Sequence, residues 1–93
     1  MSFRRLPIGQ LYMKGEMLEI TVKVTDDGKN EIYCELPDIV FGFKSCTIDY
    51  PNLVILQREG FDDEEMSYII KFIRNNKTSI NEIIETGVIY AYD

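Results

Sequence analysis

Apolar and polar residues alternate strictly along two neighbouring stretches of the chain. Their apolar members are Leu18, Ile20, Val22 and Val24 in the first stretch, and Ile32, Cys34 and Leu36 in the second. A period of two residues is typical of a strand with one buried face. Asp27-Gly28 lies between the stretches, and this dipeptide favours the positive φ of a tight hairpin turn. The pattern therefore predicts a β-hairpin.

A shorter apolar run precedes this hairpin. Residues 11–13 are expected to form a strand that pairs with it across Lys14-Gly15. Pro7 and Gly9 make the first ten residues a poor core element, because both residues weaken a strand interior. Three apolar side chains in this segment are still expected to pack down, namely Phe3, Leu6 and Ile8.

Further runs follow the hairpin. Residues 39–43 and 46–50 predict a strand with a break or bulge near Gly42. Residues 53–56 predict a short, nearly continuous apolar strand. The run 88–92 alternates once more and is expected to return to the sheet as a final strand.

The apolar period changes in the last third of the chain. Four residues there follow the repeat of an amphipathic helix, namely Met66, Ile69, Ile70 and Ile73. Asp62 is the expected N-cap, Glu65 completes a capping-box-like pair, and Asn75-Asn76 closes the helix. Ser79 repeats the capping pattern at the start of a shorter helix, which Gly87 ends.

Strands followed by two helices and a last strand are typical of an α+β domain. We expect a single domain over residues 1–93. Its antiparallel sheet of about four to six strands combines an N-terminal meander with the C-terminal strand, and two consecutive helices pack on one face. The apolar content of 45% is ordinary for a globular protein. No run approaches the roughly 18–20 apolar residues that span a bilayer, and no secretory signal follows Arg4-Arg5, so we expect a cytoplasmic protein.

The chain has two cysteines and no histidine. Cys34 and Cys46 are too far apart for a CxxC site and cannot complete a typical zinc set alone. The sequence favours two reduced thiols on buried strand faces over a disulfide between them. No metal ion or other cofactor is expected.

The net charge is −6, from sixteen acidic and ten basic residues. Part of the acid has a local role, because four carboxylates fill the start of the first predicted helix and oppose its dipole: Asp62, Asp63, Glu64 and Glu65. The hairpin carboxylates have no such role. Glu19, Glu31 and Glu35 share its solvent face with Tyr33, where like charges are mildly destabilising.

Two interpretations of this acidic face stay open. A solvated face screens like charges and needs no ligand. Alternatively, its carboxylates resemble a row of phosphates and compete for a groove lined by lysine and arginine, with Tyr33 as an anchor. The second interpretation predicts the partner-binding residues Glu19, Glu31, Tyr33, Glu35, Asp62, Asp63, Glu64 and Glu65.

Other function classes find little support in the sequence. Basic residues are outnumbered and scattered, so direct binding of nucleic acid is not expected. No nucleophile and base stand at a recognisable spacing, so catalysis is not expected. The segment 26–31 lacks the alternating ligands of a calcium loop, and a hairpin turn is favoured there.

We therefore interpret the chain as a small acidic protein-interaction module that inhibits a basic partner, such as a nucleic-acid-handling enzyme or a toxin. Immunity proteins, antitoxins and anti-defence inhibitors encoded by phages or mobile elements share this profile of size and charge, which is an analogy of profile and not of motif. The alternative is a structural or accessory subunit that forms a homodimer. Its support is the apolar run 88–92, which has no lysine or proline to protect a sheet edge.

Overall fold

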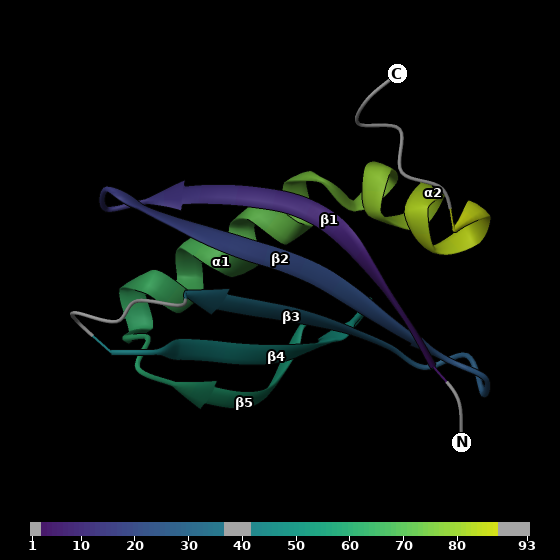
Figure 1. Ribbon diagram of the computed structural model, residues 1–93, viewed down its shortest axis with the longest axis horizontal. Helices are drawn as coiled ribbons and strands as arrows, with labels where there is room; N and C mark the ends of the chain where they lie inside the picture. The colour runs from purple at the N-terminus through teal and green to yellow at the C-terminus, as the bar shows by residue number, and fades with distance from the viewer. Residues whose placement is uncertain (1–2, 37–41, 88–93) are drawn as a thin grey trace.

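The computed structural model describes residues 3–36 and 42–87 (Figure 1). Five strands and two helices follow one another: β1 (Phe3–Met13), β2 (Glu16–Thr25), β3 (Asn30–Leu36), β4 (Lys44–Tyr50), β5 (Val54–Glu59), α1 (Asp63–Asn75) and α2 (Lys77–Thr86). The strands form one antiparallel sheet in chain order, so the predicted α+β class is confirmed. The predicted final strand over 88–92, and most of the segment expected as a strand over 39–43, lie outside the described residues.

The hairpin of β2 and β3 has the predicted form. Ile20 lies opposite Cys34 and Val22 opposite Ile32, so the apolar residues of both strands share a face. Gly28 adopts a φ of 85° in the connecting turn, and its N–H donates to the Thr25 carbonyl at 3.1 Å. A residue with a Cβ is strained at that φ, which explains the value of Asp-Gly at this point.

Residues 3–13 form a longer strand than the sequence suggested. β1 begins at Phe3 and pairs with β2 along its length, with a register irregularity between Pro7 and Gly9. Within the described residues β1 pairs with β2 alone, and an edge strand tolerates a proline that lacks a donor. Phe3 is exposed, so the expectation that it packs down is wrong, whereas Leu6 and Ile8 are partly buried against the core as expected.

One apolar cluster joins the sheet to both helices. Its strand members occupy alternate positions, including Leu18, Ile20, Val22, Ile32, Cys34, Cys46 and Ile48. The helices contribute Met66, Ile69, Ile73, Ile80 and Ile83 to the same cluster. Figure 1 shows α1 running behind the sheet and α2 beyond its end. We call the strand face of these core residues the inner face, and the face of the intervening residues the outer face.

The second helix begins earlier than predicted. α2 starts at Lys77, directly after Asn76, and Ser79 lies inside the helix as an exposed residue. The Asn76 side chain donates to the Phe72 carbonyl at 2.8 Å, so this residue closes α1 and leaves no linker before α2. Gly87 ends α2 with a φ of 66°, as predicted. Neither described helix is long and apolar enough to cross a membrane.

Strand β5 is exposed along its whole length. Its three apolar residues Val54, Ile55 and Leu56 are 53%, 42% and 52% exposed. Within the described residues β5 pairs with β4 alone, and the register shifts between Thr47 and Ile48. The apolar run that the sequence predicts as a strand is therefore an edge strand whose side chains face solvent.

Candidate protein-interaction surface

The outer face of the sheet carries its charged residues in rows that run across the strands. The first row consists of register partners: Glu19 pairs with Glu35, Glu35 with Ser45, and Ser45 with Glu59. We call Glu19, Glu35 and Glu59 the acidic row. Within the described residues none of these three carboxylates forms an ion pair.

A neutral row follows along the strands. It consists of Thr21, Tyr33, Thr47 and Gln57, which are register partners in that order. Thr47 donates to Gln57 Oε1 at 3.1 Å, and Gln57 Nε2 donates to Ser45 Oγ at 3.0 Å. These contacts hold the uncharged side chains flat beside the acidic row.

The third row has mixed charge. It consists of Arg5, Lys23, Glu31 and Asp49, again in register order. Lys23 lies opposite Glu31, and its ammonium also lies 4.7 Å from the centre of the Phe3 ring. The two cations balance the two carboxylates of this row. The negative surplus of the outer face therefore lies in the acidic row. The charge of Glu31 is offset by the cations of its own row.

Tyr33 lies beside the acidic row and is half-buried. The Arg5 guanidinium lies 5.3 Å from the centre of its ring and donates to Thr21 Oγ1 at 3.2 Å. Burial raises the pKa of the Tyr33 hydroxyl, and the adjacent Glu35 carboxylate raises it further. These residues and Glu19 line an open hollow of about 400 Å³. The Tyr33 ring and the carboxylates of Glu19 and Glu35 in this hollow would attract a cation. The Arg5 guanidinium already lies over the face of the ring.

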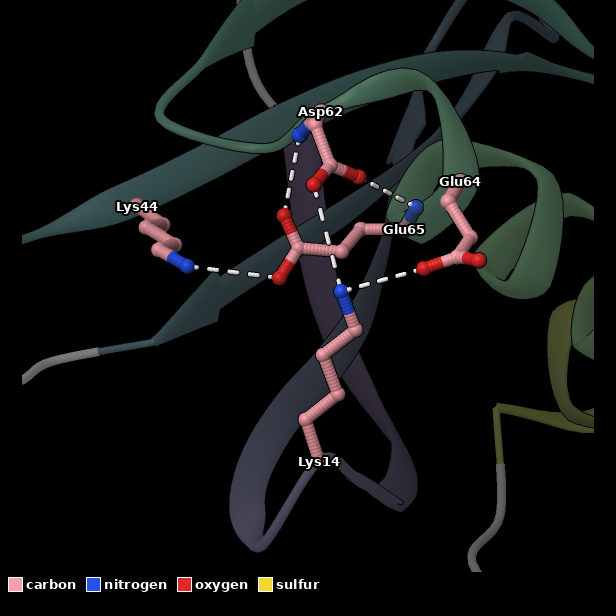
Figure 2. A network of polar contacts seen from close by, with 5 residues as sticks. All are labelled: Lys14, Lys44, Asp62, Glu64 and Glu65. Carbon is pink, nitrogen blue, oxygen red and sulfur yellow. Dashed lines mark hydrogen bonds and ion pairs between the residues drawn. The ribbon is translucent and has the colours of Figure 1, made fainter.

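The carboxylates at the start of α1 form a separate network, drawn in Figure 2. Asp62 is the N-cap and accepts from the Glu65 N–H at 2.8 Å, while Glu65 Oε1 accepts from the Asp62 N–H at 2.9 Å. The predicted capping box is confirmed. The bond from the Glu65 N–H lowers the pKa of the Asp62 carboxyl. Glu65 also pairs with Lys44 at 3.3 Å and is only 6% exposed.

Cations from distant parts of the chain neutralise this network. Lys14 Nζ lies 3.2 Å from Glu64 and 3.9 Å from Asp62, and the bond to Glu64 is the main cause of its raised pKa. Arg58 donates to Asp63 at 2.6 Å. Four carboxylates thus meet three cations, and their negative surplus is small.

The two groups of predicted site residues lie at the same end of the sheet but on opposite sides. Glu59 belongs to the acidic row, and buried Phe61 marks where the chain crosses to the helix side before Asp62. Lys44, which binds the helix network, is followed directly by Ser45, the register partner of Glu35 and Glu59. The structure therefore brings together Glu19, Glu35 and Tyr33, and it places Asp62, Asp63 and Glu64 around the edge of that surface. Buried Glu65 is not available to a partner.

Sequence reasoning left Glu59 and Asp49 out of the predicted site. The alternation of residues 45–49 could have placed Asp49 on the outer face beside Glu31. Glu59 was harder to place, because the register shift in β4 and β5 breaks the alternation that leads to it. Tyr12 is exposed on β1, whereas Tyr50 is buried and donates to Asn81 Oδ1 at 2.6 Å.

The comparisons with known proteins do not assign a function to this surface. No protein-family model, curated protein or solved structure matches the chain. Among residues 3–36 and 42–87, no three cysteine or carboxylate side chains gather as a metal site. The chemistry of the outer face itself is therefore the basis for assigning a function.

Proposed function

We propose that this protein is a small, non-catalytic interaction module that inhibits a basic partner protein by covering its cationic surface with the outer face of the sheet. The observation that carries the proposal is the acidic row, Glu19, Glu35 and Glu59, which has no ion pair within the described residues. Inhibitors of the immunity, antitoxin and anti-defence type share this size and charge, by analogy of profile.

The contrast between the two acidic groups supports this role. Carboxylates at the start of α1 stabilise the helix and are matched by Lys14, Lys44 and Arg58. Glu19 and Glu35 face each other across β2 and β3, an arrangement that destabilises a sheet slightly. The fold therefore gains nothing from this pair, and a basic partner would remove the repulsion on binding.

The surface also has the features of a binding anchor. A cationic side chain of the partner would enter the hollow between Glu19, Glu35 and Tyr33, where it would displace Arg5 from the ring. The net charge of −6 steers a basic protein toward this face and speeds its encounter. Inhibition follows because the covered cations no longer reach their own anionic ligand.

Reversing two charges of the acidic row tests the proposal. The double variant Glu19→Lys with Glu35→Lys is expected to weaken partner binding about 100-fold, because two attractive contacts become repulsive. The partner is captured from an extract of the source organism with immobilised wild-type protein at about 0.05 M salt and released at about 0.5 M. Its affinity for each purified variant is then measured by calorimetry.

The matched control is Glu82→Lys with Glu85→Lys on the exposed side of α2. It changes the net charge by the same amount but leaves the outer face intact, so it is expected to keep most of the affinity. If both double variants lose affinity equally, the loss is due to net charge alone, and the acidic row is excluded as the binding site. An inactive partner in the complex, with activity restored by high salt, would support inhibition.

Self-association is the second candidate function. Residues 88–92, on which the sequence based it, lie outside the described residues, and β5 offers separate support. Val54, Ile55 and Leu56 are exposed on a strand that pairs on one side only within the described residues. An apolar edge of this kind is a template for pairing with a second sheet. The role would be that of a structural or accessory subunit.

If β5 joins two copies, Ile55→Lys is expected to convert a dimer into a monomer, because a lysine at the edge opposes strand pairing. Size-exclusion chromatography with light scattering gives the molar mass of each form. Tyr68→Lys is the control, since Tyr68 is comparably exposed but lies on α1. A wild-type protein that is monomeric at high concentration would eliminate this candidate.

A further inference from the structure

Two cysteine side chains face each other inside the core. Cys34 of β3 and Cys46 of β4 are direct register partners, and both are fully buried on the inner face. Both are free thiols. Neither contributes to the outer face, so the proposed function leaves this pair without a role.

We propose that Cys34 and Cys46 are a modification site, at which a hydroperoxide oxidises the two thiols to an intrachain disulfide across β3 and β4. The geometry of antiparallel strands supports this. Directly opposed residues have Cα atoms about 4.5 or 5.5 Å apart, and disulfides span roughly 4.4–6.8 Å between Cα atoms. Cβ atoms of such a pair lie about 4.5–5.5 Å apart and need about 3.5–4.5 Å, so the strands close by about 1 Å or less.

The contact between the two thiols shifts their pKa values in opposite directions. The Cys34 thiol donates a hydrogen bond to the Cys46 sulfur, which lowers the pKa of Cys46 and raises that of Cys34. The thiolate is the reactive form of cysteine, so the reaction begins at whichever thiol is deprotonated, and it is written below for Cys46. The register places the two side chains next to each other on the inner face, as the second step requires.

The oxidation balances with one molecule of hydrogen peroxide. The Cys46 thiolate attacks one peroxide oxygen, the O–O bond breaks, and hydroxide leaves to form water with the thiol proton. The Cys46 sulfenic acid is then attacked by the Cys34 sulfur, the S–O bond breaks, and a second water leaves with the Cys34 proton. Two thiols and one peroxide thus yield one disulfide and two waters. Hydrogen peroxide suits a buried pair because it is scarcely larger than water.

Peptide mapping of the oxidised wild-type protein tests the proposal. The folded protein is treated with hydrogen peroxide, quenched, unfolded, alkylated and digested with trypsin. Cleavage after Lys29, Lys44 and Arg58 places the cysteines in separate peptides, 30–44 and 45–58. We expect these peptides to be joined, and to separate on reduction. The closed loop is also expected to raise the thermal midpoint by about 10 °C, reversibly with dithiothreitol.

Two variants supply the controls. Cys34→Ala and Cys46→Ala each lack one partner, so each is expected to stop at sulfenic acid or more oxidised forms of the remaining cysteine, with no joined peptide. If either variant fails to fold, the wild-type map still decides. Thiols that are fully alkylated after peroxide treatment, or sulfinic acid on one cysteine without a peptide link, would overturn the proposal. So would a link that appears only between chains on a non-reducing gel.

Discussion

Replacing Ile69 by alanine is expected to lower the free energy of unfolding by about 3–4 kcal/mol. Ile69 is fully buried on α1, in the cluster that joins the helix to the inner face of the sheet. The substitution removes buried methyl and methylene groups and leaves a cavity, and the better helix propensity of alanine offsets only part of the loss. Urea denaturation, with an unchanged slope against denaturant, measures the effect.

The control for this variant is Lys71→Ala, two residues along the same helix on its exposed side. A surface change of this kind is expected to alter stability by less than about 0.5 kcal/mol. If Ile69→Ala costs less than about 1 kcal/mol, α1 does not pack on the sheet as described. Because small domains are stable by only about 5–15 kcal/mol, a loss of the expected size also lowers the thermal midpoint clearly.

Replacing Glu65 by alanine is expected to cost about 2–3 kcal/mol. The variant loses the bond from the Asp62 N–H at the start of α1 and the ion pair with Lys44. It also leaves the Lys44 ammonium, only 23% exposed, without its carboxylate. Denaturation in urea at neutral pH compares this variant with the wild type.

Glu64→Ala is the matched control. Glu64 is the neighbouring acid on the same turn, its side chain is 83% exposed, and its ion-pair partner is Lys14. A surface pair of this kind contributes about 0–1 kcal/mol, so the control is expected to be nearly neutral. Equal losses in the two variants would mean that burial does not distinguish the two carboxylates. A reduced affinity of Glu65→Ala for the partner, without loss of stability, would contradict the structural role assigned to Glu65.

The elements that sequence analysis predicted best are those with local signals. The β2–β3 hairpin follows from strict alternation and Asp27-Gly28, and α1 follows from its apolar repeat with Asp62 and Glu65 at its start. In each case the residues that define the element are neighbours in sequence. Local propensity and tertiary packing agree there, so the pattern and the fold give the same answer.

The elements predicted poorly depend on context. Pro7 argues against a strand unless that strand lies at a sheet edge, and the place of β1 at the edge of the described sheet is set by all its strands together. Ser79 carries a capping signal, but Asn76 already closes α1 by its bond to the Phe72 carbonyl, and α2 starts without delay. The exposure of β5 likewise reflects its place at the end of the described sheet, where it pairs with β4 alone.

The candidate site likewise has a part that a local sequence pattern predicts and a part that depends on contacts between distant residues. Alternation alone placed Glu19, Glu35 and Tyr33 on one face, as the register confirms. The neutralisation of the helix acids by Lys14 and Lys44 joins residues far apart in the chain, and no local pattern contains it. The sequence therefore overstated the charge available at the start of α1 and omitted Glu59 from the outer face.

The order of the elements has a consequence for biosynthesis. Among the described elements, the five strands precede both helices along the chain, and each strand pairs with its neighbour in sequence. The strands therefore emerge from the ribosome before the helices that cover their apolar inner face. At a translation rate of about 5–20 residues per second, residues 60–86 take about 1–5 s to follow. During that interval the nascent sheet is most vulnerable to aggregation, and a chaperone that shields it would act there.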